Sequence, residues 1–550
     1  MIASGLLADA SPARRVRALA LCACVALFVV HASRYLGHIV DDSYIYYRFA
    51  ENFARSHGLV FNPDERVEGH SSTLWTLLLG LYGKLGLPIP AMARWSGIGV
   101  AALTLLCSWR LALRFGTPPG QALVVAALLA MSVPLAYWAA SGMPEVLLAL
   151  LLVISALAYL RELEQPARFP HSAFWLILVA LTRPESFALP AVFVGHSLAH
   201  SWLHDRLRRH RRQILLRALI AGAGLAAFFA WRLHYYGWPL SNATYAKLGG
   251  EDGLASPYAL AQYRAGLLYL RGFLLAHAPL ALAGLACCAF LWPLRRHPLL
   301  SLALLLGGFQ VLLILKGGGD WMPLWRFILP ALPFALVLCA RGAALIATRW
   351  PRLRALPVAG LVAAGGASLY LVDRQADPRL EAMNQAWSSA WETAHELRAI
   401  IPPGELIASC AMGVVPYALL DNPFVDMVGL CDVHIAHHGR RANPQLGAPD
   451  DYWEKADMDY VFERRRPQWV LVNRSLAGTD GEGGPRSTER VRGSDGRDWS
   501  VSRTSATNQL AATHPALARD YELVAEIQNR PLPGSPLERI SRRMFVYRRR

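Results

Sequence analysis

Two adjacent acidic residues, Asp41 and Asp42, follow the first long apolar run of the chain. A carboxylate in such a place can take the proton of an acceptor hydroxyl, which is a poor nucleophile while it is neutral. A phosphate leaving group would need cations to balance its charge, and four candidates flank later apolar runs: Lys247, Lys316, Arg183 and Arg326. These residue types predict group transfer to a hydroxyl. A simpler interpretation stays open, in which the aspartates are the hydrated end of a span and the cations are interfacial anchors.

The elements that must position these residues are membrane spans. Of the 550 residues, 54% are hydrophobic and only 17% are charged, against roughly 25% charged residues in an average soluble domain. About eleven apolar runs approach the roughly 20 residues that cross a bilayer, and the chain from about residue 375 onward is polar. The sequence therefore predicts a polytopic α-helical membrane module over residues 1–374 and a C-terminal soluble α/β domain over residues 375–550.

Arginines set the predicted orientation. The chain has 55 Lys and Arg against 39 Asp and Glu, a formal net charge of +16, and many arginines lie in short loops between apolar runs, where they mark the cytoplasmic side rather than a nucleic-acid site. Arg14, Arg15 and Arg17 place the N-terminus in the cytoplasm, and we expect the first run to be retained. An odd number of crossings then delivers the C-terminal domain outside. We expect a protein of the bacterial cytoplasmic membrane with a periplasmic or extracytoplasmic C-terminal domain.

The polar residues that solvated flanks do not explain fall on this predicted outer side: the two aspartates, the four cations, His70, Glu145, Glu185 and Asp320. ATP and sugar nucleotides are absent there, so a synthetic reaction needs an activated substrate that arrives through the membrane. A lipid-linked phosphosugar meets that need. The expected partners are this donor, an envelope glycan or lipid acceptor, and membrane lipids.

Two segments of the first predicted outer loop favour helices that lie flat at the outer interface. Residues 42–55 carry Ile45, Phe49 and Phe53 at helical spacing, together with tyrosines 44, 46 and 47, whose rings suit the headgroup region. Residues 74–87 are apolar but too short to span comfortably. We therefore include interfacial helices over residues 41–90 in the membrane module.

The C-terminal domain alternates helical and extended patterns. A helix is predicted over residues 380–399, and short strands over residues 406–409, 469–473, 521–527 and 544–548. Residues 478–500, rich in Gly, Asp, Arg and Ser, are typical of a flexible loop. Cys410 and Cys431 both lie in this domain, and the sequence leaves open whether they form a disulfide.

The first predicted outer loop resembles that of the GT-C membrane glycosyltransferases, in residues 41–50, 58–63 and 67–75. More closely, it is similar to the branch that contains the mycobacterial terminal β-(1→2)-arabinofuranosyltransferase and the flagellar motor control protein ZomB. Further segments resemble this branch in the same order: residues 141–145, 242–249, 318–327 and, more weakly, 426–432.

The resemblance implies a multi-spanning helical GT-C fold, inversion at the anomeric carbon, and a polyprenyl-phosphate sugar as donor. The family's acidic pair falls on Asp41 and Asp42, and Asp41 becomes the first choice for the catalytic base. In a helix, Asp42 points about 100° away, so it would orient the acceptor or bind a cation. Some relatives need a divalent metal and others do not, which leaves the metal open. The branch implies an arabinofuranose-like pentose as the first sugar to consider.

We also expect the other polar residues to divide by role. Lys247, Lys316, Arg326 and Arg183 are predicted to bind the donor phosphate. The predicted acceptor or substrate contacts are Glu145, His70, Asp320, Trp321 and Tyr245. Simpler interpretations stay open for two of them, because His70 fits an interfacial histidine satisfied by water and Glu145 fits a turn residue with a solvated carboxylate.

Two other functions compete with an inverting glycosyltransferase. A transporter or flippase generally has ionisable groups near the bilayer midplane and two related halves, whereas the apolar runs have Leu, Ala and Val at their centres and show no internal repeat. A non-catalytic envelope or motility-associated membrane protein fits the likeness to ZomB, but it leaves the acidic pair unexplained.

Overall fold

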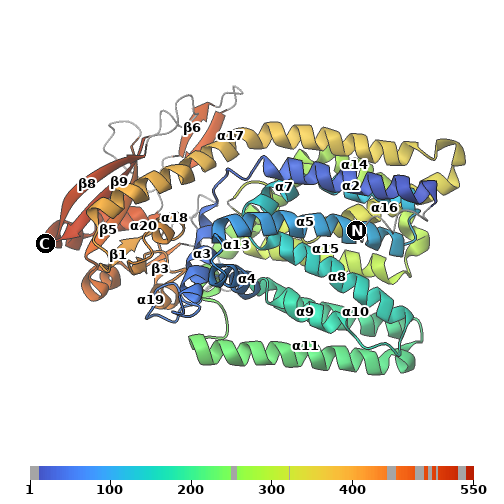
Figure 1. The fold of residues 1–550 in the computed structure, drawn as a ribbon, viewed down its shortest axis with the longest axis horizontal. Helices are drawn as coiled ribbons and strands as arrows, with labels where there is room; N and C mark the ends of the chain where they lie inside the picture. Colours follow the sequence, from blue (N-terminus) through green and yellow to red (C-terminus); the bar gives the residue numbers. More distant parts are fainter. Residues whose placement is uncertain are drawn as a thin grey trace. The chain divides into compact units, whose positions relative to one another are not determined.

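A computed structural model shows a mostly helical chain that ends in a mixed sheet (Figure 1). It describes residues 11–248, 257–320, 322–442, 454–476, 488–492, 498–502, 506–529 and 541–550. The chain forms two compact units. Unit 1 comprises Met1–Gly37, Arg94–Ala227 and Gly266–Gln375, and unit 2 comprises His38–Ala93, Phe228–Ala265 and Ala376–Arg550.

Long apolar helices make up unit 1, and some of them extend into unit 2. In the described part of the chain, seven helical segments are long and apolar enough to cross a membrane. They are Pro12–Ser33 (α2), Ile89–Arg114 (α5), Glu145–Glu164 (α8), Leu207–Tyr236 (α11), Pro298–Gly317 (α15), Leu332–Arg349 (α16) and Pro351–Gln375, which contains the first part of Leu356–Ile400 (α17).

Two bent helix pairs raise this number to at most nine. Pro119–Ala130 (α6) and Val133–Ala140 (α7) meet at 59°, and the pair around Pro257–Ala276 (α13) and Ala278–Cys288 (α14) bends by 88°. Judged by the length and composition of the helices, the prediction of about eleven spans is therefore too high. Its two extra runs are Ser172–Ala180 (α9) and Leu189–Leu203 (α10).

The break between α9 and α10 has a local cause. Pro184 and Pro190 interrupt the chain, and Pro184–Ala188 forms a 3₁₀ turn in place of a continued α-helix. Helices of 9 and 15 residues are each shorter than the roughly 20 residues that span a bilayer. Leaving out this pair keeps the number of crossings odd, so the predicted orientation does not depend on it.

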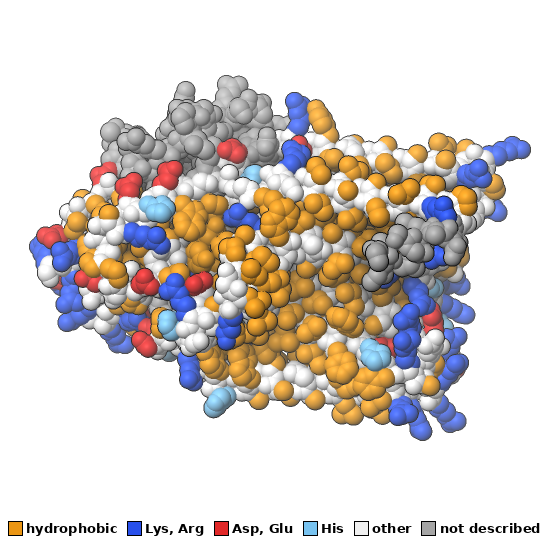
Figure 2. Space-filling model, in the orientation of Figure 1, with side chains coloured by type: hydrophobic (Ala, Val, Ile, Leu, Met, Phe, Trp, Pro, Cys, Tyr) orange, Lys and Arg blue, Asp and Glu red, His pale blue; other side chains and the backbone are white. Residues whose placement is uncertain are grey.

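The surface of unit 1 separates apolar from basic residues. In Figure 2, hydrophobic side chains cover the helices, and Lys and Arg side chains gather at their right-hand end. Five exposed arginines belong to the connection from α10 to α11 and to the first turns of α11: Arg206, Arg208, Arg209, Arg211 and Arg212. The arrangement suits the predicted cytoplasmic side, and the orientation itself stays a prediction.

In unit 2, the predicted first-loop helices are present as Asp41–Ala54 (α3) and Thr73–Lys84 (α4), which pack against each other. The expectation for the three tyrosines is wrong. Tyr44, Tyr46 and Tyr47 are at most 4% exposed, and Tyr44 contacts Trp391 and Tyr417 edge to face at 5.5 and 5.4 Å. The Tyr47 ring lies 6.0 Å from that of Tyr417, and the Tyr46 hydroxyl forms a hydrogen bond of 2.5 Å with Ser71. All three rings therefore face other parts of the protein.

The C-terminal segment forms the predicted α/β structure. Its five-stranded sheet has the order β2-β1-β5-β9-β8. β1 is parallel to its two neighbours, and β9 is antiparallel to β5 and β8. The strands are Ile407–Ser409 (β1), Phe424–Asp426 (β2), Trp469–Leu476 (β5), Tyr521–Asn529 (β8) and Ser541–Arg549 (β9). Four of these strands were predicted, and β2 was missed.

Both faces of the sheet are covered. Alternate residues of β5 point to opposite faces, so Trp469 and Leu471 join one apolar cluster, with α17, and Val470 and Val472 join another. The second cluster includes residues of Ala506–Thr513 (α20) and Pro515–Asp520 (α21). Shorter elements complete the unit: Asn242–Leu248 (α12), Val414–Ala418 (α18), Val433–His438 (α19), Arg440–Arg441 (β3) and Lys455–Ala456 (β4).

The structure bears on three further features of this unit. Residues 478–500 were predicted as a flexible loop, but Thr488–Arg492 (β6) pairs antiparallel with Asp498–Ser502 (β7); residues 478–487 and 493–497 of the predicted loop lie outside the described residues. No disulfide joins Cys410 and Cys431. Residues 41–90, assigned to the membrane module, fall in unit 2 with the C-terminal segment, since Ile45, Phe49 and Phe61 belong to an apolar core cluster of that segment.

Candidate active site

The predicted catalytic residues Asp41 and Asp42 open helix α3. Asp41 is 7% exposed. Its Oδ1 accepts a hydrogen bond of 2.8 Å from the backbone N–H of Val414, the first residue of α18. A side chain at Gly413 would not fit, because a Cβ there would lie 2.1 Å from the backbone oxygen of Asp41. The chain therefore uses a glycine to bring α18 against the start of α3.

The two aspartates lie in different environments. Burial raises the pKa of Asp41 from 3.8 to about 7; the hydrogen bond from Val414 opposes this shift, and the neighbouring carboxylate of Asp42 adds to it. The Asp42 side chain is partly exposed, and none of the described residues gives its carboxylate a hydrogen bond or an ion pair. Asp41 is thus a carboxyl group that can gain or lose a proton near neutral pH.

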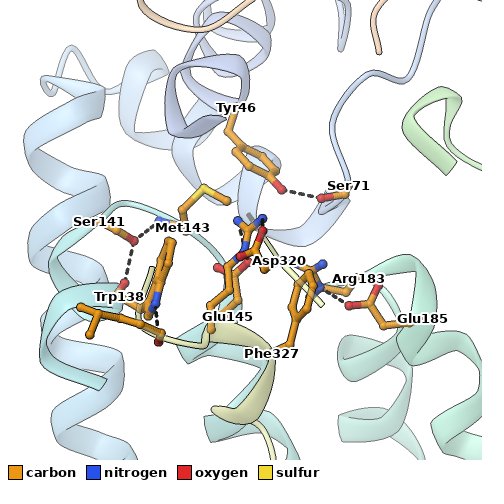
Figure 3. A network of polar contacts seen from close by, with 12 residues as sticks. Tyr46, Ser71, Trp138, Ser141, Met143, Glu145, Arg183, Glu185, Asp320 and Phe327 are labelled. Atoms are coloured by element: carbon orange, nitrogen blue, oxygen red, sulfur yellow. Dashed lines mark hydrogen bonds and ion pairs between the residues drawn. The ribbon is translucent and has the colours of Figure 1, made fainter. Parts of the chain in front are cut away.

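Four predicted residues of unit 1 meet in one charge cluster (Figure 3). Glu145, the first residue of α8, is 1% exposed, and its Oε1 lies 2.7 Å from Nη1 of Arg183 and 3.4 Å from Nη1 of Arg326. Asp320 holds Arg326 with both oxygens, at 2.5 and 3.1 Å. Arg183 also pairs with Glu185. The cluster contains three carboxylates and two guanidinium groups.

Aromatic rings line this cluster. The guanidinium groups of Arg183 and Arg326 lie 5.2 and 5.3 Å from the ring centre of Phe327, and Arg326 lies 5.3 Å from that of Trp138. The Trp138 indole N–H donates to the backbone oxygen of Leu324 at 3.0 Å. These rings hold the arginines by cation–π contact.

The turn before Arg326 has an unusual backbone. Leu324 and Trp325 adopt left-handed φ angles of 63° and 44°, which cost free energy in residues other than glycine. Gly319, also left-handed, lies against the Tyr269 side chain, where a Cβ would come within 2.7 Å of the Tyr269 Cβ and 2.8 Å of its ring. The Tyr269 hydroxyl in turn accepts the backbone N–H of Phe327 at 3.2 Å. This turn places Arg326 on Asp320.

The remaining predicted phosphate ligands do not join the cluster. Lys316 is exposed near the end of α15 in unit 1, and Lys247 is exposed on α12 in unit 2. Trp321 lies outside the described residues. Of the predicted phosphate ligands, the structure brings together Arg183 and Arg326, and both are already paired with carboxylates.

His70 is not an interfacial histidine. It is 1% exposed, and the Phe49 ring lies edge to face with it at 4.8 Å. Burial lowers the pKa of His70 to about 3, and the charge of Arg232 adds to the shift, so the ring is neutral near pH 7. The neighbouring Glu68 forms a buried ion pair of 2.7 Å with Arg232, and sequence reasoning missed this pair.

Tyr245 lies among other aromatic residues. Its ring centre is 4.3 Å from that of His437 and 5.8 Å from that of Trp238. The sequence gave no sign that a histidine of the C-terminal segment meets this tyrosine. Among the residues that the structure describes, no group of three or more His, Cys, Asp or Glu side chains is arranged to hold a metal ion.

Two solved structures are similar to this chain over most of its length. ArnT from Cupriavidus metallidurans bound to undecaprenyl phosphate aligns over 98% of both chains, with a TM-score of 0.52 and 14% sequence identity. The Archaeoglobus fulgidus oligosaccharyltransferase, in a complex with Zn and sulfate, aligns over 82% of this chain and 67% of its own, with a TM-score of 0.50 and 13% identity. The chain has the GT-C fold.

Sequence comparison adds two findings on this GT-C chain. It is 30% identical to the terminal β-(1→2)-arabinofuranosyltransferase of Mycobacterium tuberculosis over 259 residues. That match spans 43% of this chain and 37% of the mycobacterial protein, so little more than a third of the relative is matched. Residues 379–547 match the model of a domain of unknown function, DUF8728.

Proposed function

We propose that this GT-C chain is an inverting glycosyltransferase. It transfers a sugar from a polyprenyl-phosphate donor to a cell-envelope glycan or lipid at the outer face of the bacterial cytoplasmic membrane. The observation that carries the proposal is the acidic pair that opens α3, in which one carboxyl group is buried with a pKa of about 7 and the next is partly exposed. The fold and the mycobacterial relative support it.

In the proposed reaction, Asp41 is the base. The acceptor oxygen forms a bond to the anomeric carbon on the face opposite the phosphate, while the acceptor proton passes to the Asp41 carboxylate. The bond from the anomeric carbon to the phosphate oxygen breaks, and its electron pair leaves with the polyprenyl phosphate. The backbone N–H of Val414 fixes one Asp41 oxygen at 2.8 Å, which leaves the other to receive the proton. Asp42 orients the acceptor or binds a cation.

Arg183 is the proposed ligand of the donor phosphate. A phosphate would compete with the carboxylates already bound to this arginine. Glu145 is 1% exposed on its side chain and Glu185 is 25% exposed, so Glu185 is the carboxylate that can move into water. Arg326 is held by Asp320 through two contacts, and its proposed role is to position Glu145 and the phosphate. Lys247 and Lys316 stay candidates for the same anion.

The donor sugar can be identified directly. The mycobacterial relative is named for arabinofuranose transfer, which makes a polyprenyl-phosphate arabinofuranose the first donor to test, followed by other pentoses and hexoses. The purified full-length protein is incubated with each donor, and release of polyprenyl phosphate is measured. We expect one sugar to be consumed. If none is consumed with any envelope acceptor, the proposal is wrong and a transporter or a non-catalytic membrane protein becomes the better interpretation.

A further inference from the structure

Three aromatic side chains of unit 2, Trp238, Tyr245 and His437, form what we call the aromatic platform. Trp238 follows Gly237, whose left-handed φ of 79° ends α11. Its indole stacks on the His437 ring with 3.9 Å between ring centres and an angle of 27° between the rings. Tyr245 of α12 lies 4.3 Å from the same histidine. The platform thus joins residues that are about 200 positions apart in the sequence.

Hydrogen bonds hold the platform in place from two sides. The Asn242 side-chain amide of α12 donates to the backbone oxygens of Gly429, Leu430 and Asp432, at 2.8 to 3.1 Å. Lys455 donates to the backbone oxygens of Tyr245 and Ala436, at 3.1 and 2.6 Å. A surface whose backbone is fixed in this way loses little conformational entropy when it binds a ligand.

The platform is accessible from outside. Trp238 is 38% exposed, Tyr245 and His437 are partly exposed, and Lys247 lies exposed on the same short helix as Tyr245. Burial lowers the pKa of His437, and the charges of His438 and Lys455 add to the shift. The ring is therefore neutral near pH 7.

These features fit a carbohydrate. A sugar ring presents a C–H face that packs on an aromatic ring, whose face carries partial negative charge, and its hydroxyl groups need polar partners at the edge of that contact. The Tyr245 side chain, which is partly exposed, supplies a hydroxyl. A tryptophan near the end of a span is often an anchor in the membrane interface, but such an anchor does not need a histidine of the C-terminal segment stacked on it.

We propose that the aromatic platform binds a sugar unit of the acceptor glycan. This unit is a different one from the unit whose hydroxyl reacts. The inference rests on the proposed glycosyltransferase function, and it narrows the acceptor to a carbohydrate. Trp238 determines the affinity of the platform for this sugar unit, and it takes no part in the chemical step.

Binding of a free oligosaccharide tests the platform without any donor. The probes are a synthetic arabinofuranose disaccharide and maltose, titrated by calorimetry into the purified full-length protein. We expect saturable binding of at least one probe, weakened roughly tenfold by Trp238→Ala and partly recovered in Trp238→Phe. Trp202→Ala is the matched control, because Trp202 is 68% exposed on α10 of unit 1. No binding of either sugar, or equal binding by wild type and Trp238→Ala, overturns the inference.

A second measurement on the wild-type protein does not depend on how the variants fold. Hydroxyl-radical oxidation followed by mass spectrometry should show Trp238 protected by the bound disaccharide and Trp202 unprotected. Equal oxidation of Trp238 with and without the sugar overturns the inference. Donor turnover separates this result from the proposed function, because a protein that binds the sugar but consumes no donor keeps the platform and loses the glycosyltransferase assignment.

Discussion

The carboxylate of Asp41 accepts a hydrogen bond of 2.8 Å from the backbone N–H of Val414, 373 residues further along the chain. This contact ties the start of α3 to α18 in the C-terminal segment. Asp41 is the proposed base, and the C-terminal segment contributes directly to its environment. Two predictions follow from this contact, one electrostatic and one steric.

The pH dependence of transfer should report the pKa of Asp41. Because burial raises that pKa to about 7, kcat/KM should rise tenfold per pH unit below about pH 7 and level off above it. The stability of the protein should change with pH in the opposite direction to the rate. A carboxyl group with a raised pKa contributes stability below its ordinary value of 3.8, and this contribution is lost as the pH rises to about 7. A rate that is flat between pH 5 and 8 would contradict the assignment.

Stability measurements can check the same pKa independently. Asn keeps an acceptor oxygen for Val414 but carries no charge, so Asp41→Asn should unfold at a higher temperature than wild type at pH 8 and at a similar temperature at pH 4. The measurement is thermal unfolding in detergent at the two pH values. A lower unfolding temperature for Asp41→Asn at pH 8 would show that the buried carboxylate is stabilised by its surroundings.

A methyl group at Gly413 should disturb the site without changing any charge. A Cβ there would lie 2.1 Å from the backbone oxygen of Asp41 and 2.4 Å from its Cγ, so Gly413→Ala must displace Asp41 or α18. We expect transfer to fall at least tenfold, since small displacements of catalytic groups are costly. Gly360→Ala is the control, because a Cβ at that helical position meets no atom within 4 Å. Full activity of Gly413→Ala would mean that the position of Asp41 does not matter.

A buried ion pair in unit 1 should matter for stability more than for transfer. Arg217 and Glu162 pair at 2.9 Å with side chains at most 1% exposed, and Ser172 and Ser197 bind the same guanidinium group. Arg217→Met leaves Glu162 unpaired and should destabilise the protein by roughly 3–5 kcal/mol. Adding Glu162→Gln should recover part of this loss, as thermal unfolding would show.

An exposed pair provides the comparison. Arg114 and Glu164 form an ion pair of 2.7 Å, but their side chains are 35% and 56% exposed. Arg114→Met should cost no more than about 1 kcal/mol. Equal effects of Arg217→Met and Arg114→Met would show that burial does not set the cost of breaking these pairs.

The predicted orientation places the C-terminal segment outside the cell. Alkaline phosphatase, which is active only outside the cytoplasm, should therefore be active when fused after Arg550, and a cytoplasmic reporter fused there should be inactive. When the same two reporters are fused within the arginine-rich residues 206–212, alkaline phosphatase should be inactive and the cytoplasmic reporter active. Cytoplasmic activity of the reporter after Arg550 would overturn the orientation and the assignment of the acidic pair to the outer face.

Local patterns in the sequence were sufficient for much of the fold. Apolar runs and their flanking arginines located the long helices, and short extended patterns located β1, β5, β8 and β9. The acidic pair was correctly placed next to a helical segment, because Asp41 and Asp42 begin α3. The three α3 tyrosines were misread, since an amphipathic helix looks the same whether its rings face headgroups or another part of the protein.

The charge cluster shows what local patterns could not supply. Glu145, Arg183, Asp320 and Arg326 come from segments up to 181 residues apart, and each was selected singly as a polar residue near the end of an apolar run. Their mutual pairing depends on the packing of helices and on the left-handed turn at Leu324 and Trp325. That pairing also changes the expectation that the two arginines bind the donor phosphate, because each of them already forms an ion pair with a carboxylate.

The role of Asp41 is tested most directly by comparing Asp41→Asn with Asp42→Asn in the donor-turnover assay. We expect Asp41→Asn to lower kcat by roughly 10²–10⁴-fold while donor binding is kept. Asp42→Asn should lower the rate less and keep the rise with pH below about pH 7. If Asp41→Asn transfers sugar at the wild-type rate, or if Asp42→Asn alone abolishes both transfer and its pH dependence, Asp41 is not the base.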